Sequence, residues 1–573
     1  MLRGKIHFRA GATAITVMFL LLAFAGDAIA MPPYPGAPDD PQSATMAQAL
    51  HQQYIDLQDG WREKGIDQPA DIDFQDWMRS SATASKNILC ILVRFPDLAP
   101  ISADSYFDTL IYVNQSGSVR HYYNEVSFNQ VDIITVDLPS SIGWLTAPNN
   151  NAYYVNGAYG TGSYPNNCQK LVEDAVDLAD GLIDFSNYDN DSDGYVDGLM
   201  VVHTGEGAEL TGSVNDIWSH KWAITPRLKD GKYIFTYAIM PEYWYSANDM
   251  TLGVFCHELG HVFGLPDLYD TDNSSRGIAR WSLMASGSWN GSLGDSPAHF
   301  DAWCRIQLGF ASYTNISTTS YGTSVPNVET SGKIFRLWTN GSASDEYYLV
   351  ENRKQTGYDT YLPSAGLLIW HIDENVSDNN DEWYPGHTAF GHYEVALVQA
   401  DNLWELEKNL DYGDTGDPFP GSTSNTAFTP LSTPGSNSYS GSESLVSVTN
   451  ISAAGDTMTA DFSVSFISDA DDPADDPPLP ESFSVEQNYP NPFNSATVIS
   501  YSLQNAGEVE IEIFNILGQT VISERQDIGQ PGAHSFEWDG RDSNGNEVPA
   551  GVYFYRLSVD EEQHDVKKML FLK

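Results

Sequence analysis

The stretch T-L-G-V-F-C-H-E-L-G-H-V-F-G-L-P-D-L-Y-D, residues 251–270, constrains the fold of this chain more than any other. His257 and His261 are four residues apart, so on a helix both imidazoles lie on one face, one turn apart, where they can share a metal ion. Gly264 stands where a left-handed helix cap is expected, and the proline two residues later prevents the helix from continuing. The chain must therefore turn directly after the second histidine, and this turn can bring Asp267 back toward the metal.

Two histidines and one carboxylate, with a fourth position left open, make a catalytic rather than a structural zinc site. We therefore predict that His257, His261 and Asp267 bind Zn²⁺. Glu258 lies one step around the helix, where it cannot easily join the coordination sphere but can reach a water bound to the metal, so we predict it as the catalytic base. The alternative is a core helix with two incidental histidines, and the helix stop and the following G-x-x-D argue against it.

The third ligand distinguishes two classes of zinc peptidase. No glutamate occurs between Glu258 and Glu329, so the thermolysin-like arrangement, which takes a glutamate from a second helix, has no local candidate. The stretch resembles instead the metzincin pattern H-E-x-x-H-x-x-G-x-x-H/D, with Asp267 in the last place. That pattern includes a methionine-bearing turn beneath the metal, for which W-S-L-M-A-S-G-S-W supplies Met284. Some metzincins carry a tyrosine two residues later, but this chain has Ser286, so no tyrosine ligand or oxyanion stabiliser is expected there.

Length and charge set wider bounds. A chain of 573 residues has room for several domains. Lys and Arg number 28 and Asp and Glu 77, which gives a net charge of −49 at pH 7. Such a surface repels phosphate backbones, which argues against a nucleic-acid partner. It suits solubility, calcium binding or a salty habitat, and composition does not decide among these.

Residues 1–30 have the features of a secretory signal peptide. Basic residues lie among the first nine, residues 14–25 are mostly apolar, and Ala28-Ile29-Ala30 is a small-x-small cleavage pattern. The apolar run is short for a membrane span, and no later stretch approaches the required length. We expect a secreted or cell-surface protein with no transmembrane span after signal removal, the alternative being an uncleaved N-terminal anchor.

Residues 31–85 are polar and at first proline-rich, and they precede a predicted buried strand at Asn87–Phe95. A peptidase active during its own synthesis would endanger the cell, so we interpret this stretch as a pro-segment, with a flexible arm as the alternative. The segment contains no cysteine, which excludes latency by a thiolate bound to the zinc. A carboxylate of the segment that blocks the zinc stays an alternative.

Four cysteines, Cys90, Cys168, Cys256 and Cys304, allow three pairings. A disulfide between Cys256 and Cys304 would cross-link the predicted zinc site covalently, and buried free thiols are the alternative.

The run D-N-D-S-D-G-Y-V-D, residues 189–197, matches the first part of an EF-hand calcium loop, with glycine at the sixth place. The twelfth place is Met200 rather than a bidentate glutamate, so a complete EF-hand is absent. A structural Ca²⁺ is expected, and a solvated acidic turn is the alternative. The predicted ligands are the side chains of Asp189, Asp191, Asp193 and Asp197 with the carbonyl of Tyr195.

Residues 86–312 alternate predicted helices and strands and form the predicted catalytic domain. Residues 118–133 read as a helix, a turn and a strand, residues 167–182 as an amphipathic helix, and Leu199–His203 as a strand. A strand edge beside a peptidase cleft can hold an extended peptide by main-chain pairing. Whether the strand at 199–203 offers such an edge stays open.

Several motifs together resemble the secreted immune-inhibitor-A-type metallopeptidases over roughly residues 85–465. They are S-V-R-H-Y-Y-N-E-V-S-F, D-I-W-S-H-K-W, the histidine motif, S-L-M-A-S-G-S-W, E-Y-Y-L-V-E-N-R, G-L-L-I-W-H-I-D-E and G-D-P-F-P-G. The resemblance implies a zinc endopeptidase made as a zymogen with bound calcium, in which His257 and His261 bind zinc and Glu258 is the general base. Some relatives place a glutamate directly after the aspartate, where this chain has Leu268.

Three further segments complete the predicted organisation. Residues 313–467 are predicted as a β-rich domain packed on the catalytic unit, and His371, His387 and His392 lie there without metal-ligand spacing, which favours structural roles. Residues 468–480 are an acidic, proline-rich linker. Residues 481–573 alternate with period two and are predicted to form an Ig-like sandwich.

The final segment also resembles known modules. Q-N-Y-P-N-P-F-N, W-D-G-R-D-S-N-G and P-A-G-V-Y-F-Y-R-L are similar to C-terminal sorting modules of type IX secretion cargo, and the same fold occurs in flagellar hook-capping proteins. The resemblance implies an export machinery as partner, and an adhesion or spacer module is the alternative.

The predicted fold is thus an α+β metzincin-like zinc peptidase domain, a β-rich domain and a C-terminal Ig-like β-sandwich. The predicted function is a secreted, monomeric zinc endopeptidase acting on extracellular proteins. Two alternatives stay open: a non-catalytic exported surface-binding protein on a protease scaffold, and a zinc amidase acting on cell-wall peptides.

Overall fold

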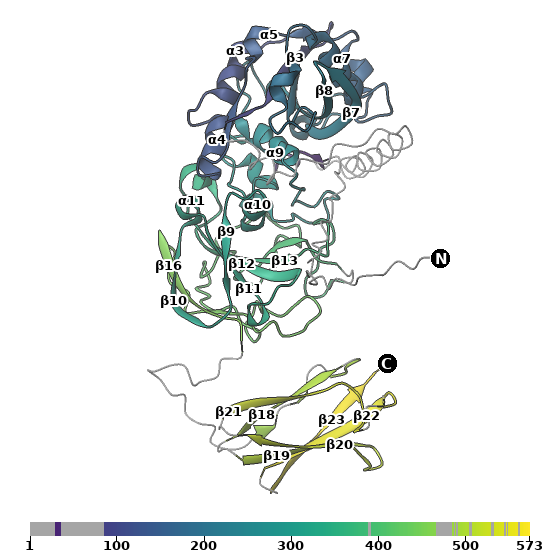
Figure 1. Ribbon diagram of the computed structural model, residues 1–573, viewed down its shortest axis with the longest axis vertical. Helices are drawn as coiled ribbons and strands as arrows, with labels where there is room; N and C mark the ends of the chain where they lie inside the picture. Colours follow the sequence, from purple (N-terminus) through teal and green to yellow (C-terminus); the bar gives the residue numbers. More distant parts are fainter. Residues whose placement is uncertain are drawn as a thin grey trace, which may run out of the picture. The chain divides into compact units, whose positions relative to one another are not determined.

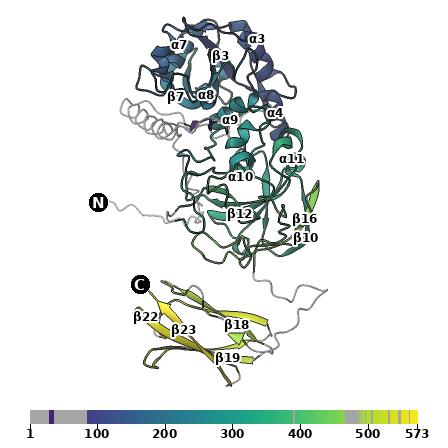
Figure 2. The same cartoon turned by 180° about the vertical axis from the view of Figure 1, so that it is seen from behind.

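The computed structural model describes residues 29–35, 85–387, 391–465 and, with short gaps, 484–572. Most of the predicted signal peptide (1–28), most of the pro-segment (36–84) and the linker (468–480) lie outside the described residues. The chain divides into two compact units between Ser465 and Phe466. Each unit is described by itself, and Figures 1 and 2 show the elements of both from opposite sides.

A six-stranded sheet forms the centre of the first part of unit 1. Its order is β1-β7-β8-β6-β3-β5, in which β8, β6, β3 and β5 run parallel and β7 runs antiparallel to β8. The short β1 pairs antiparallel with the other edge of β7. The strands are β1 (Ile29–Ala30), β3 (Leu89–Arg94), β5 (Leu145–Thr146), β6 (Leu199–His203), β7 (His220–Lys229) and β8 (Lys232–Pro241).

The sheet separates two hydrophobic cores because side chains alternate along its strands. In β3, Ile91 packs in one core with helix α7 (Cys168–Ala179), and Leu92 packs in the other with helices α4 (Val119–Val126) and α9 (Leu252–Val262). The predicted strand at Asn87–Phe95 is divided. Its start belongs to β2 (Ser85–Asn87), which pairs with β4 (Asp132–Ile134), and the rest is β3.

Shorter elements connect these layers. They are α3 (Asp104–Phe107), the π-helix η1 (Asp108–Tyr112), α5 (Pro139–Ile142), α6 (Asn151–Val155), α8 (Ala208–Thr211), α10 (Ala302–Gln307), α11 (Val328–Ser331) and the 3₁₀-helices η2 (Phe185–Tyr188), η3 (Ala279–Trp281), η4 (Ser286–Trp289), η5 (Thr339–Gly341) and η6 (Gly357–Tyr361). Within the described ranges, no helix is long and apolar enough to span a membrane.

The second part of unit 1 is β-rich. One sheet has the order β14-β13-β12-β11-β9 and another the order β10-β16-β15, and a separate core lies between them. The strands are β9 (Ser312–Ile316), β10 (Ser320–Pro326), β11 (Lys333–Leu337), β12 (Glu346–Arg353), β13 (Gly366–Asp373), β14 (Val395–Leu397), β15 (Ser447–Thr449) and β16 (Thr457–Ser463).

A buried ion network joins the two parts of unit 1. Arg353, at the end of β12, has no solvent exposure and donates two hydrogen bonds to Asp359, of 3.0 and 2.8 Å. It also donates to the carbonyl of Trp281 and lies 3.3 Å from Glu351. The Arg353 guanidinium therefore has hydrogen-bond partners in both parts of unit 1. It fixes the β-rich part against the segment that follows the histidine motif.

Unit 2 consists of two antiparallel sheets that enclose one core. Their orders are β17-β18-β21 and β20-β19-β22-β23. The strands are β17 (Ser484–Val485), β18 (Thr497–Leu503), β19 (Gly507–Asn515), β20 (Thr520–Ile528), β21 (Gly532–Trp538), β22 (Gly551–Val559) and β23 (Glu562–Phe571). Trp538 lies in the core against Phe571 and Tyr553. This arrangement agrees with the predicted sandwich.

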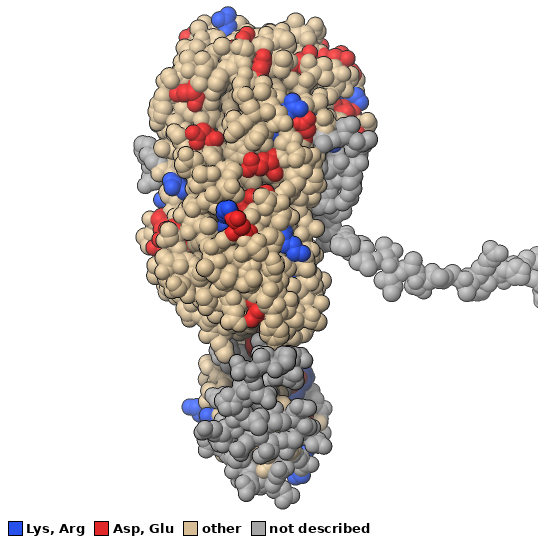
Figure 3. All heavy atoms as spheres, turned by 90° about the vertical axis from the view of Figure 1, so that its left-hand side faces the viewer, with Lys and Arg blue, Asp and Glu red and all other residues tan. Residues whose placement is uncertain are grey.

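The acidic composition is visible on the surface of unit 1. Figure 3 shows acidic side chains spread over one face of this unit rather than gathered in a single patch. This distribution gives no local evidence for a dedicated binding surface on that face.

Candidate metal centre

Helix α9 and the turn after it carry the predicted ligands. The helix ends at Val262, and Gly264 adopts φ +91°. The Gly264 N–H donates to the carbonyl of His261 (3.0 Å) and the Leu265 N–H donates to the carbonyl of Gly260 (3.2 Å). These two bonds form a Schellman motif, which needs a left-handed residue and therefore favours glycine. The chain reverses at this point, as the sequence predicts.

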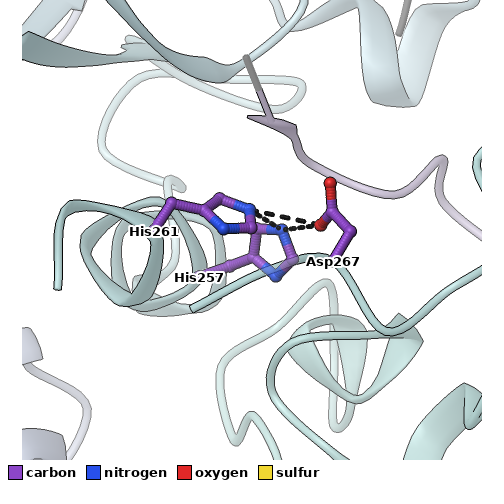
Figure 4. A group of neighbouring side chains, drawn as sticks. All are labelled: His257, His261 and Asp267. Atoms are coloured by element: carbon purple, nitrogen blue, oxygen red, sulfur yellow. Dashed lines mark hydrogen bonds and ion pairs between the residues drawn. The ribbon is translucent and has the colours of Figure 1, made fainter. Parts of the chain in front are cut away.

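Three ligand atoms converge beside the helix. Asp267 Oδ1 lies 3.2 Å from the Nε2 atoms of both His257 and His261, and the two Nε2 atoms are 2.9 Å apart. Figure 4 shows both rings extending from one helix toward the carboxylate. Ligand atoms 2.0–2.2 Å from a tetrahedral zinc lie about 3.3 Å from one another. The spacing of the three atoms therefore fits one zinc ion.

The hydrogen bonds around the histidines also fit a cation. Nδ1 of His257 donates to the carbonyl of Leu283 and Nδ1 of His261 to the carbonyl of Leu265, each at 2.8 Å. In the neutral rings these bonds leave the Nε2 atoms as bare acceptors that face one another. Asp267 Oδ1, also buried, has no hydrogen-bond donor. Three lone pairs in one buried place without a proton between them are unfavourable unless a cation binds them.

Glu258 lies within the same buried space. Its side chain has no solvent exposure, and neither carboxylate oxygen has a hydrogen-bond partner. Burial raises the pKa of Glu258 well above its usual range, the charges of Asp267 and Glu209 raise it further, and the backbone of Met31 opposes them.

Met284 lies on the turn directly beneath helix α9. A Cβ atom added to Gly260 would meet the Met284 sulfur at 2.6 Å, so only glycine allows this approach. The carbonyl of Met284 accepts the N–H of Leu268 at 2.8 Å, which ties the turn to the ligand segment. Met284 thus contacts both the helix that carries the two histidines and the segment that carries Asp267.

Residues 29–34 approach this centre, and the first two of them form the strand β1. Ala30 pairs with His220 on the edge of β7, and the Met31 N–H donates to the carbonyl of Ser219 at 3.0 Å. The Ala30 N–H lies 3.4 Å from Asp267 Oδ2. Farther along, the indole of Trp289 donates to the Pro32 carbonyl at 2.9 Å.

The main-chain pairing answers the open question about a peptide-binding edge. β6, at Leu199–His203, lies inside the sheet between β3 and β8, so its edges are both occupied. The edge that receives an extended segment belongs to β7, which the sequence analysis did not assign as a strand. Neighbouring aromatic and basic residues around Trp222 interrupt the alternation of polar and apolar residues by which a strand is predicted.

One residue of the site was missed altogether. The phenol of Tyr269 donates to the Ala30 carbonyl at 2.5 Å. Burial raises the pKa of Tyr269 well above its usual range, with the charges of Asp267 and Glu258 adding to the shift, so the phenol keeps its proton at neutral pH. No local pattern marked this residue, because its contact with Ala30 joins positions 239 residues apart.

The predicted calcium loop also gathers carboxylates. Oxygens of Asp189, Asp191 and Asp197 lie within 4.8 Å of one another, and Asp189 Oδ1 is buried without a hydrogen-bond partner. Gly194 adopts φ +99°, as the sixth place of such a loop requires. Two other features limit the predicted set. Asp193 lies outside the group and accepts the Tyr195 N–H at 2.8 Å, and the Lys232 ammonium forms an ion pair with Asp189.

Other predicted features of unit 1 take structural roles. The four cysteines are buried thiols, so the alternative of a Cys256–Cys304 disulfide is not realised in this structure. His371 and His392 stack on opposite faces of Tyr439, at 3.9 and 3.8 Å between ring centroids. His387 lies 3.4 Å from Glu382. A further group that the sequence analysis did not single out, Asp401, Glu405 and Asp414, also brings carboxylate oxygens within 4.8 Å of one another.

Two regions of the chain match known protein families. Residues 102–310 match the family described as immune inhibitor A peptidase M6, catalytic domain, and residues 493–564 match the FlgD Ig-like domain. The chain is 32% identical over 222 residues to the pre-pro-metalloprotease PrtV of Vibrio cholerae serotype O1, a match that covers 33% of this chain and 23% of that protein. It is 35% identical over 218 residues to immune inhibitor A of Bacillus thuringiensis subsp. alesti, covering 32% of this chain and 30% of that protein.

Among solved structures, FlgD from P. aeruginosa is 25% identical, with a TM-score of 0.12, over 13% of this chain and 66% of that chain. The chain thus spans less than a third of the length of the curated relatives that it matches. All the residues of the candidate metal centre from His257 to Met284 lie within the matched peptidase region. The similarity and the geometry together support a metallopeptidase domain over this region.

Proposed function

We propose that this protein is a secreted zinc endopeptidase that hydrolyses peptide bonds of extracellular proteins, on a metzincin-like catalytic domain. The observation that carries the proposal is the convergence of His257, His261 and Asp267 in a buried space, with Nδ1 of each histidine committed to a carbonyl. A donor set of two imidazoles and one carboxylate with room for a fourth ligand is that of catalytic zinc.

When bound, zinc would polarise the scissile carbonyl and lower the pKa of the attacking water. The residues of the chain carry out the remaining tasks. Glu258, which is not a ligand, accepts the proton of the attacking water and delivers it to the departing amine. The edge of β7 holds the substrate backbone in an extended conformation by main-chain hydrogen bonds, as it holds Ala30.

The variant Glu258→Gln tests this proposal. We expect it to bind zinc like the wild type and to lose casein hydrolysis by a factor of about 10²–10⁴, because it removes the proton acceptor but no ligand. The measurements are zinc content by mass spectrometry and proteolysis with and without a chelator. Asp345→Asn, which changes an exposed acid of the β-rich part, is the control. Cleavage by Glu258→Gln at the normal rate would refute the assignment.

Two outcomes would favour the alternatives. A wild-type protein that binds zinc and cleaves muropeptides but not proteins would be an amidase. A protein that cleaves neither would be a surface-binding protein on a protease scaffold, for which the Ig-like module is the supporting feature.

The organisation of the chain supports further parts of the proposal. We propose that residues 31–85 are a pro-segment, a proposal supported by the hydrogen bonds of residues 31–34, at its start, with Ser219, Glu209 and Trp289 near the candidate metal centre. We also propose a structural Ca²⁺ at Asp189, Asp191 and Asp197, supported by the unpartnered buried oxygen of Asp189. Export through the C-terminal module, by resemblance to type IX cargo, and a monomeric state complete the proposal.

A further inference from the structure

One peptide bond of the precursor chain, Ala30–Met31 at the predicted end of the signal peptide, lies next to the candidate metal centre. This bond lies near the predicted ligand Asp267, because the Ala30 N–H is 3.4 Å from Asp267 Oδ2 and the Met31 N–H donates to the carbonyl of Ser219, the residue before β7. Ala30 and Met31 are 2% and 1% exposed. This bond therefore shows which groups of the site meet a carbonyl in the cleft.

The group that meets the Ala30 carbonyl is the phenol of Tyr269, at 2.5 Å. The side chain of Tyr269 is largely buried, and its ring lies 6.5 Å from that of His257 between centroids. The phenol is thus close both to the carbonyl and to the ligand that begins the metal centre.

Two main-chain hydrogen bonds hold Tyr269 in this orientation. The N–H of Leu268 donates to the carbonyl of Met284 (2.8 Å), and the carbonyl of Leu268 accepts the N–H of Ile278 (3.0 Å). These bonds fix the main chain at Leu268 and, with it, the positions of its two neighbours. Those neighbours are Asp267 and Tyr269. The segment thus delivers a metal ligand and a hydrogen-bond donor to the same space.

We propose that Tyr269 is a catalytic residue that donates a hydrogen bond to the carbonyl oxygen of the scissile bond and stabilises the negative charge that develops there. This inference rests on the proposed peptidase function. As water attacks the carbonyl carbon, the electron pair of the C=O bond moves to the oxygen, and the phenol keeps its proton while it shortens its hydrogen bond. When the carbonyl re-forms, the C–N bond breaks and the amine leaves with the proton carried by Glu258. A donor placed in this way acts on the transition state more than on the ground state.

The variant Tyr269→Phe, measured in the active secreted protein, removes the donor and keeps the ring. By analogy with other oxyanion-stabilising donors, we expect kcat on a fluorogenic peptide to fall about 10²–10³-fold with KM changed less than about threefold. We expect unchanged zinc content. Affinity for a phosphinic peptide, which imitates the tetrahedral transition state, should fall with kcat, while affinity for an amide peptide of the same sequence should not.

Tyr123→Phe is the matched control. The Tyr123 phenol is buried and donates to the carbonyl of Cys256 in helix α9, at 2.8 Å, and the Tyr123 ring packs against Tyr122, Phe263 and Phe300. We expect this variant to lose a comparable hydrogen bond and to keep kcat. If Tyr269→Phe does not accumulate as a folded protein, 3-fluorotyrosine at position 269 keeps the shape and makes the phenol more acidic, and kcat should then change while KM does not.

Three results separate the possible failures. Unchanged kcat in Tyr269→Phe, with an active wild type, overturns the role of Tyr269 alone. Loss of zinc in Tyr269→Phe, with activity restored by excess zinc, means that the phenol only orients Asp267 and also overturns the proposal. A wild-type protein that binds zinc but cleaves no peptide refutes the proposed function, and the catalytic role of Tyr269 with it.

Discussion

Glu407 offers a direct test of how burial controls the stability of unit 1. Its carboxyl is 5% exposed, and one oxygen accepts a hydrogen bond of 2.7 Å from Gln399. Burial raises its pKa from 4.5 to about 7, against the lowering effect of its hydrogen bonds. Because the pKa in the folded state is the higher one, the stability that this group contributes is fully present below pH 4.5. It is lost as the pH rises through 7.

The size of the loss follows from the shift. A difference of about 2.5 pKa units corresponds to about 3 kcal/mol once the pH is well above 7. Glu407→Gln keeps the shape and the acceptor for Gln399 but carries no charge at any pH. We therefore expect the variant to match the wild type near pH 5 and to exceed its free energy of unfolding by up to about 3 kcal/mol at pH 9.

Urea unfolding at pH 5, 7 and 9 measures this difference. The comparison is between the pH dependences of the variant and of the wild type, because other buried acids such as Glu329 and Glu394, each with a pKa raised by burial to about 8, also destabilise the wild type at high pH. Asp345→Asn, an exposed acid, is the control. Equal pH dependences for Glu407→Gln and wild type would show that the Glu407 carboxyl is not held in the dry environment described above.

Two further predictions concern stability. Arg353→Met should lower the free energy of unfolding by about 3–5 kcal/mol in urea unfolding, because it leaves Asp359 and its neighbours as buried carboxylates without their partner; a loss below about 1 kcal/mol would contradict the network. Asp189→Asn should lower the thermal unfolding midpoint more in calcium-containing buffer than in chelator, where only its ion pair with Lys232 is lost, if this loop binds Ca²⁺. A difference between variant and wild type that is equal in both buffers would contradict the calcium site.

Local signals made the core of the site predictable. The four-residue spacing of His257 and His261, the glycine cap and the proline act within one stretch of chain, so periodicity and helix-stop chemistry were enough to predict both the helix and its reversal. The position of Met284 was predictable only through resemblance, because the contact that defines it, with Gly260, joins two segments. The strand at Leu199–His203 was found with its bounds because it is short, apolar and buried on both faces.

Features that depend on distant segments were not predictable. The role of Tyr269 follows from the anchoring of Leu268 by Met284 and Ile278, which no local pattern encodes. The pairing of β1 with β7 joins residues almost 200 positions apart. The choice between a disulfide and thiols for Cys256 and Cys304 depended on relative placement, which spacing in sequence does not report.

The Schellman turn after α9 has a consequence for redesign. Its two hydrogen bonds join main-chain atoms only, so they do not depend on which side chain occupies position 267. The third predicted metal ligand, Asp267, can therefore be substituted while the turn is kept. Variants such as Asp267→His would show which other metals the site can bind. Insertion or deletion of one residue between Gly264 and Asp267 would rotate the donor out of reach. The turn therefore tolerates substitution at position 267 but not insertion or deletion of a residue.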